Sequence, residues 1–220
     1  MADDNGPMDA KDDQSALLSA MTTEHFVMQS AIGAALNEAQ SRANMFIGAL
    51  SGALVAMGFA TQSQTIFLPF VATVLPAIFV MGVFTVLRLV DVSVEGARAE
   101  IRIATIRRFY RSLGGDAEAL FSPDLGRWPE DRANPALRLG PFVAYWTTAA
   151  AMIAAIDALV AAAGIVLLLH LGTGFNLAIA ILIGAAVALG LLVAFHYLQK
   201  MRITESESYA RDIASIRSEY

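Results

Sequence analysis

The stretch Arg88–Arg138, RLVDVSVEGARAEIRIATIRRFYRSLGGDAEALFSPDLGRWPEDRANPALR, separates two long apolar blocks. It holds nine of the 15 basic residues, whereas residues 43–87 contain no Asp, Glu, Lys or Arg and residues 139–199 contain only Asp157. One helical span needs about 20 apolar residues, so each block is long enough to cross a bilayer twice. The pattern predicts an all-α integral membrane bundle of four transmembrane helices, arranged as two hairpins with helical cytoplasmic extensions.

The composition supports a membrane protein and argues against nucleic-acid binding. The 220 residues are 56% hydrophobic and 16% charged, whereas a soluble domain is usually about a quarter charged. The central segment has nine Arg against eight acidic residues, so it is a mixed, solvated segment and not a basic patch. With no cysteine, the chain has neither a disulfide nor a thiolate ligand.

Composition shifts along the chain place the boundaries. We expect an acidic disordered tail over 1–22, because this part is rich in Asp and contains Asn5-Gly6-Pro7. Residues 23–113 should form a cytoplasmic helix, the first hairpin with spans at about 44–60 and 66–89, and a helical extension. Residues 114–141 should form a cytoplasmic Gly/Pro linker. Residues 142–220 should form the second hairpin, with spans at about 142–169 and 177–197, and a cytoplasmic C-terminal helix.

The distribution of basic residues predicts the orientation. All 15 lie near the N-terminus, in the centre or near the C-terminus, and the turns at residues 61–65 and 170–176 have none. Because cytoplasmic loops carry the excess of Lys and Arg, we expect a multi-pass protein of the plasma membrane with both termini cytoplasmic. In a bacterium this is the cell inner membrane.

Small residues at four-residue intervals predict close helix packing. Gly48 and Gly52 form a GxxxG in the first span, and Gly184 lies on a similar stripe in the fourth. Small residues let helix backbones approach closely in lipid. We expect these glycines to lie against another helix, in the same bundle or in a neighbouring subunit. The expected partners are the lipid bilayer and either further copies of this chain or another membrane protein.

Asp157 is the one acidic residue inside the apolar blocks. A charge at the bilayer centre costs about 2.5–3.5 kcal/mol, so this side chain should face the bundle or an oligomer axis. The polar residues expected at similar depth are Ser51 and Thr73, together with the carbonyl freed by Pro76. Two roles fit: a neutral hydrogen bond between helices, or a part in ion passage or proton sensing.

A basic cluster, Arg107, Arg108 and Arg111, lies near the end of the cytoplasmic extension of the second span. It fits contact with lipid headgroups or an acidic partner, and it equally fits a solvated helix end. The three histidines are dispersed and no pair of acids lies within the membrane, so the sequence predicts no catalytic, metal or cofactor site and argues against an enzyme.

Two resemblances bear on function. The stretches Thr22–Phe26 and Asn37–Ala43, leading into Met45–Phe59, resemble a group of uncharacterised bacterial four-span membrane proteins. The layout of hairpins with helical cytoplasmic extensions is similar to that of the SLATT and Pycsar-type membrane effectors of bacterial defence. That resemblance implies assembly and membrane perturbation in response to a nucleotide signal, and it carries over no nucleotide-binding residue.

Three functional classes follow. The first is an oligomeric pore-forming or membrane-effector protein controlled through its cytoplasmic helices, which the small-residue stripes and amphipathic extensions favour. The second is a non-catalytic scaffold or accessory subunit of a larger complex, which the same features permit. The third, a transporter or an enzyme, fits poorly, because small exporters have short loops and this chain has a central segment of about fifty residues.

Overall fold

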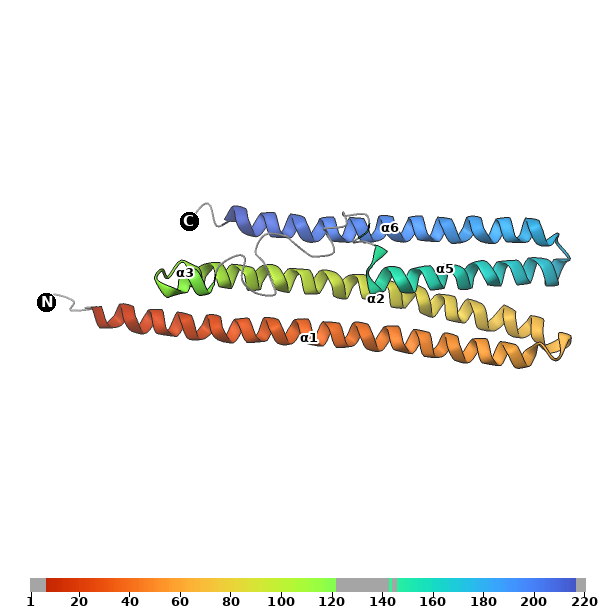
Figure 1. The fold of residues 1–220 in the computed structure, drawn as a ribbon, viewed down its shortest axis with the longest axis horizontal. Helices are drawn as coiled ribbons and strands as arrows, with labels where there is room; N and C mark the ends of the chain where they lie inside the picture. Colours follow the sequence, from red (N-terminus) through yellow and green to blue (C-terminus); the bar gives the residue numbers. More distant parts are fainter. Residues whose placement is uncertain (1–6, 122–142, 144–145, 217–220) are drawn as a thin grey trace. The chain divides into compact units, whose positions relative to one another are not determined.

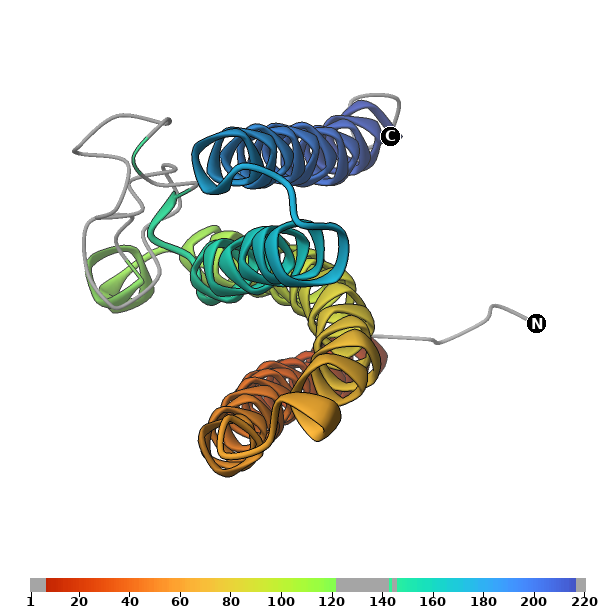
Figure 2. The same ribbon diagram turned by 90° about the vertical axis from the view of Figure 1, so that its right-hand side faces the viewer.

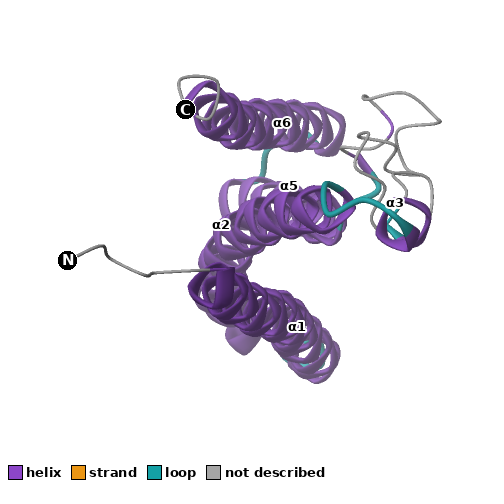
Figure 3. Ribbon diagram, turned by 90° about the vertical axis from the view of Figure 1, so that its left-hand side faces the viewer, coloured by secondary structure: helices purple, strands orange, loops and turns teal. Residues whose placement is uncertain are grey.

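A computed structural model of the chain describes residues 7–121, 143 and 146–216, and those residues form helices and short connections without a strand (Figure 3). Four of the helices are long and apolar enough to cross a membrane. This confirms the predicted all-α class with four transmembrane helices.

The helices are long and joined by short turns. In chain order they are α1 (Pro7–Ala60), α2 (Gln64–Arg111), the short α3 (Asp116–Leu120), α5 (Ala149–Leu167), a π-helical turn η2 (Leu168–Gly172) and α6 (Leu177–Ile216). The expected first, second and fourth spans lie inside α1, α2 and α6. α2 runs without interruption through both of its prolines, Pro69 and Pro76.

The start of α1 corrects the expected disordered tail over residues 1–22. The helix begins at Pro7, well before residue 23, and residues 1–6 lie outside the described part. Proline suits the first position of a helix because the N–H it lacks would have no partner there.

The start of α5 corrects the third span, which was expected from residue 142. The helix begins at Ala149, because Thr148 has an extended backbone and its side chain accepts a hydrogen bond from the Ala151 N–H at 3.1 Å. The expected linker 114–141 contains α3, and its residues 122–141 lie outside the described part.

Glycine ends α2 close to the expected position. The helix was expected to run to about residue 113, and it ends at Arg111. Gly114 and Gly115 follow with φ of 75° and 60°, a backbone conformation that strongly favours glycine. Arg108 and Arg111 lie in the last turn, where a cation interacts favourably with the helix dipole.

The chain divides into two units. Unit 1 comprises Met1–Leu36 and Glu95–Ala133, and unit 2 comprises Asn37–Val94 and Asn134–Tyr220. Within unit 1 the Thr22 hydroxyl hydrogen-bonds the Tyr110 hydroxyl at 3.2 Å. The Tyr110 ring packs on Phe121 with centroids 5.1 Å apart. Unit 2 contains the apolar blocks and is the part that matters for the membrane.

Within unit 2 the helices lie side by side in the order α1, α2, α5, α6 (orange, yellow, teal and blue in Figures 1 and 2). Of the most apolar stretch of each helix, 33% is buried in α2 and in α5, against 17% in α1 and 11% in α6. α2 and α5 are therefore the middle helices, and α1 and α6 are edges that present most of their surface to the surroundings.

The core of unit 2 is apolar and draws on all four helices. Phe46 of α1, Val71 of α2 and Ile153 of α5 are 0% exposed, and Phe195 of α6 is 8% exposed in the same cluster. Each fully buried aliphatic or aromatic side chain is worth about 1.5–3 kcal/mol in water, but between helices in lipid the gain comes from packing contacts instead. The close contacts across α2 and α5 therefore hold the unit together.

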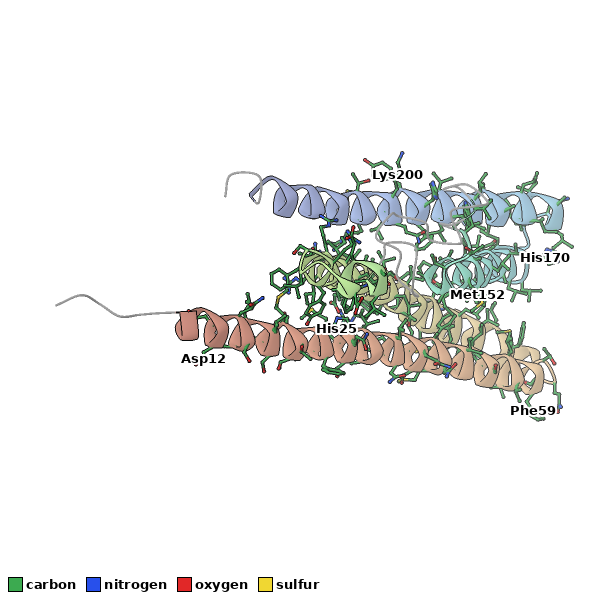
Figure 4. The ribbon with its side chains drawn as sticks, turned by 60° about the vertical axis from the view of Figure 1, so that its left-hand side comes forward. Asp12, His25, Phe59, Met152, His170 and Lys200 are labelled. Carbon is green, nitrogen blue, oxygen red and sulfur yellow. The ribbon has the colours of Figure 1, made fainter. Side chains whose placement is uncertain are left out.

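The two hairpin turns lie at the same end of unit 2. A Cβ on Gly172, in η2, would lie 4.0 Å from Leu68 near the start of α2. The labelled Phe59 and His170, beside the two turns, lie at one end in Figure 4. The second turn is closed by a 2.9 Å contact between His170 Nδ1 and the Phe175 carbonyl. Both expected turns are thus confirmed as connections between spans.

Because the two turns share one end, single cysteines at Gln62 and Thr173 should react alike with a membrane-impermeant thiol reagent in intact cells. Both side chains are exposed, and the cysteine-free chain gives no background labelling. Ser112→Cys, beyond the far end of α2, is the control and should react only after permeabilisation if both turns are outside. Labelling of one turn position without the other in intact cells would contradict the arrangement.

Candidate functional site

Asp157 lies in the interior of unit 2, as expected. It occupies the middle of α5 and is 4% exposed. Its Oδ1 is buried and has no hydrogen-bond partner among the residues that the structure describes. Buried polar atoms are usually hydrogen-bonded, so an unpartnered carboxyl oxygen at this depth is a candidate functional group.

The residue that receives Asp157 is Gly82 of α2. A Cβ placed on Gly82 would overlap the Asp157 carboxyl, including Oδ2 at 2.8 Å. The carboxyl therefore occupies the space of the side chain that glycine lacks, against the backbone of the neighbouring helix. Only glycine fits opposite Asp157 without a shift of one of the two helices.

The structure does not bring Ser51 and Thr73 to Asp157, which corrects the expected polar site. Both side chains are exposed and bonded to their own helices. The Ser51 hydroxyl donates to the Ile47 carbonyl at 2.8 Å, and the Thr73 hydroxyl donates to the Pro69 carbonyl at 3.0 Å.

The register of α2 against α5 explains that correction. Asp157 lies against Gly82. Seven residues further along α5, a Cβ placed on Gly164 would lie 3.4 Å from Leu75 Cδ1. The helices α2 and α5 are thus antiparallel, and their register is the same at both contacts. Thr73 is nine residues from Gly82, or about 14 Å along the helix axis. Counted from the turns, Thr73 is nine residues from Gln64 whereas Asp157 is 15 residues from Gly172, so the two do not lie at the same depth.

A second group of polar side chains, the interfacial cluster, consists of Glu38, Arg42 and Arg88. Glu38 and Arg42 are one turn apart on α1, and Arg88 faces them from α2. Arg88 donates to both carboxylate oxygens of Glu38, from Nε to Oε1 at 2.9 Å and from Nη2 to Oε2 at 3.0 Å. Arg42 Nε also donates to Oε1 at 2.9 Å. A paired contact of this kind fixes direction as well as distance.

The interfacial cluster flanks the charge-free block of residues 43–87 and lies outside it. Hydrogen bonds from Arg88 and then from Arg42 lower the pKa of Glu38 from 4.5 to about 2. The Glu38 carboxylate therefore stays ionised at physiological pH. Two guanidinium groups around one carboxylate give the cluster a net charge of +1.

The second hairpin carries a polar pair at the equivalent place. Gln199, 4% exposed on α6, donates from Nε2 to the Thr148 hydroxyl at 3.1 Å. Glu38 and Arg88 are 50 residues apart in sequence, and Thr148 and Gln199 are 51 apart. Each pair thus lies about 25 residues, or roughly 38 Å of helix, from its turn. That length matches a hydrocarbon core of about 30 Å plus one interface.

Two further contacts lie near this boundary in unit 2. The Trp146 ring stacks on His196 with centroids 5.8 Å apart and planes 6° from parallel. Arg202 of α6 lies 3.6 Å from the Asp91 carboxylate of α2. Aromatic and basic side chains are typical anchors at a membrane interface.

The small-residue stripes behave differently in the two hairpins. A Cβ on Gly184 would lie 2.8 Å from Val166 Cγ2 and 3.0 Å from the Ala162 carbonyl oxygen, so α6 approaches α5 closely there. Gly48 and Gly52 are exposed, and nothing described lies within 4 Å of a Cβ on either. Within the described part of the chain, the first stripe is therefore open, and the second is packed against a neighbouring helix.

The basic cluster belongs to unit 1. Arg108 is exposed, whereas Arg107 and Arg111 are partly buried. Arg111 Nη1 donates to the Phe121 carbonyl at 3.3 Å, so this arginine helps to hold the segment after α3. Arg111 thus has a structural role that the sequence did not indicate.

Comparisons with protein-family models, with curated proteins and with solved structures gave no match to this chain.

Sequence reasoning missed Gly82 and the interfacial cluster, although the second left a signal. Residue 63 ends the first turn, and Glu38 and Arg88 are each 25 positions from it. In an antiparallel hairpin with a short turn, such residues face one another. Gly82 left no comparable signal, because pairing α2 with α5 depends on a register that the turns do not set.

We predict that Gly82→Ala destabilises the protein by about 1–3 kcal/mol, the usual cost of an overfilled core. Asp157→Ala in the same chain should remove most of that cost, because the added methyl then meets no carboxyl. Unfolding in mixed detergent micelles measures both effects. Gly190→Ala is the matched control, since a Cβ there has no described neighbour within 4 Å. Additive costs in the double variant would refute the contact.

We also predict that Glu38 stabilises the fold in a pH-dependent way. Its pKa is lowered from 4.5 to about 2 in the folded state, so its contribution is complete above about pH 5 and is lost as the pH falls towards 2. Glu38→Gln should therefore melt slightly below the wild type at pH 7 and close to it at pH 2–3, since solvent screens the ion pairs of this partly exposed carboxylate. Glu24→Gln, at an exposed position of α1, should match the wild type throughout. A pH-independent difference for Glu38→Gln would contradict the ion pairs.

Proposed function

We propose that this chain is an oligomeric integral membrane protein of the pore-forming or membrane-effector type, controlled through its cytoplasmic helices. The observation that carries the proposal is the open face of α1. This helix lies at an edge of unit 2, and Gly48 and Gly52 leave a strip within its apolar part that no described residue covers. Such a strip suits the close approach of an equivalent helix from another copy.

The packing of unit 2 favours a route for ions between copies of the protein and not through the interior of a single copy. Phe46, Val71 and Ile153 fill the interior and are 0% exposed. Ions need a continuous line of water or polar groups along their route. The carboxyl of Asp157 is surrounded by apolar side chains in the described interior, so it does not form such a line by itself. In our proposal a pore forms where several copies meet, with α1 at the contact.

The continuity of α2 supports control from the cytoplasmic side. This helix runs unbroken from Gln64, beside the first turn, to the basic residues Arg108 and Arg111. An event at the basic end can therefore bias the packing of the apolar part along one continuous helix. We propose that both termini are cytoplasmic, because the basic residues lie away from the turns.

The test is to reconstitute the purified chain in liposomes and to measure both its oligomeric state and the release of a trapped ion or small dye. We expect an oligomer and release above that of empty liposomes. Gly52→Leu should lower both without lowering the melting temperature, because a Cβ at this position has no described neighbour within 4 Å.

Gly58→Leu is the matched control, since it is equally open and on the same helix. It lies six residues from Gly52, which places it about 240° round the axis and off the stripe. It should assemble and release as the wild type does. A stable oligomer that releases nothing would support a scaffold or accessory subunit instead, and a monomer would overturn both.

A further inference from the structure

An open groove runs between α1 and α2 in unit 2. Its volume is about 320 Å³, and its wall includes Arg42 and Met45 of α1 and Ala77, Val80, Phe84 and Thr85 of α2. Met45, Val80 and Phe84 are 68%, 50% and 66% exposed, so the wall is accessible from the side. The groove is apolar except at the end that carries Arg42 and Thr85.

The position of the groove in the sequence gives its position in the membrane. Arg42 directly precedes the charge-free residues 43–87, so the polar end lies at the membrane boundary. From Thr85 to Ala77 the groove extends eight residues along α2, or about 12 Å, into the apolar block. An occupant must therefore be apolar over most of its length and polar at one end.

The charge at the polar end of the groove determines which charge the polar end of the occupant must carry. Arg88 donates to both oxygens of Glu38, so the positive charge of this guanidinium is balanced by the one carboxylate of the interfacial cluster. Arg42 adds a second guanidinium, and its bond to Glu38 uses only Nε. A guanidinium has five N–H donors, so the remaining ones suit a phosphate. The Arg42 side chain is 47% exposed and thus accessible.

We propose that this groove binds an anionic phospholipid, with its phosphate at Arg42 and one acyl chain along Met45, Val80 and Phe84. The acyl chain fills the apolar groove, which opens towards the hydrocarbon of the bilayer. The headgroup contacts the interfacial cluster, whose net charge is positive. Basic residues beside a span attract anionic lipid, each by an amount that corresponds to about fivefold in affinity.

The experiment compares dioleoylphosphatidylglycerol with dioleoylphosphatidylcholine on the full chain in neutral detergent. Native mass spectrometry counts retained lipid, and a melting curve gives the stabilisation. We expect the phosphatidylglycerol to be retained preferentially and to raise the melting temperature more. Arg42→Gln should reduce the preference about fivefold. Arg202→Gln should keep it, because Arg202 is 45% exposed and also lies beside an acid but is not part of the groove wall.

A second variant keeps the test sharp if Arg42→Gln folds poorly. Val80→Trp fills the groove from its open side and should abolish the preference while the protein melts normally without added lipid. Leu182→Trp, at a position of α6 that is 69% exposed, should have no effect. Equal retention of both lipids, or an unchanged preference in Val80→Trp, overturns the proposal. A changed oligomeric size in Val80→Trp with lipid retention unchanged would assign the groove to a second copy of the chain.

Discussion

In hydrocarbon a chain must satisfy its own backbone hydrogen bonds, and this constraint governs unit 2. A helix does so within itself, so each apolar block becomes two long helices joined by a short turn. Polar side chains link the two arms of each hairpin about 25 residues from the turn, Glu38 with Arg88 and Thr148 with Gln199. These links lie at the same distance from the turn on both hairpins and give the unit a defined polar edge.

The contact between the hairpins rests on small residues. Gly82 admits the carboxyl of Asp157, and Gly164 admits Leu75, so α2 and α5 pack in a fixed antiparallel register. Close approach of backbones replaces the hydrophobic driving force that is weak between helices in lipid. The same contact buries a carboxyl oxygen without a described partner.

The edges of unit 2 carry the surfaces with which we associate function. α1 has an open glycine strip on one part of its surface and an apolar groove with a cationic end where it meets α2. Gly48 and Gly52 suit a flat helix surface, and the groove suits a flexible chain with an anionic end. Met45 of the groove wall is three and seven residues before Gly48 and Gly52, so the two surfaces are neighbours on one face of α1.

The sequence by itself determined the helical class, the four spans and the two turns. Those follow from the length of the charge-free blocks and from the turn residues, both of which are local properties. It also contained the pairing of Glu38 with Arg88, because a short turn fixes which residues face each other within one hairpin. The helical start at Pro7 was missed because the Asp-rich composition of this part indicated a solvated tail.

Only the tertiary structure decided which surfaces meet. Hydropathy does not separate a helix face that touches lipid from one that touches another helix, since both are apolar. Gly184 therefore packs on α5 while Gly48 and Gly52 stay open, although all three belong to similar stripes. For the same reason Asp157 faces Gly82 and not Ser51 or Thr73. Its partner depends on the register between two hairpins, which the packing of small side chains sets and no local pattern encodes.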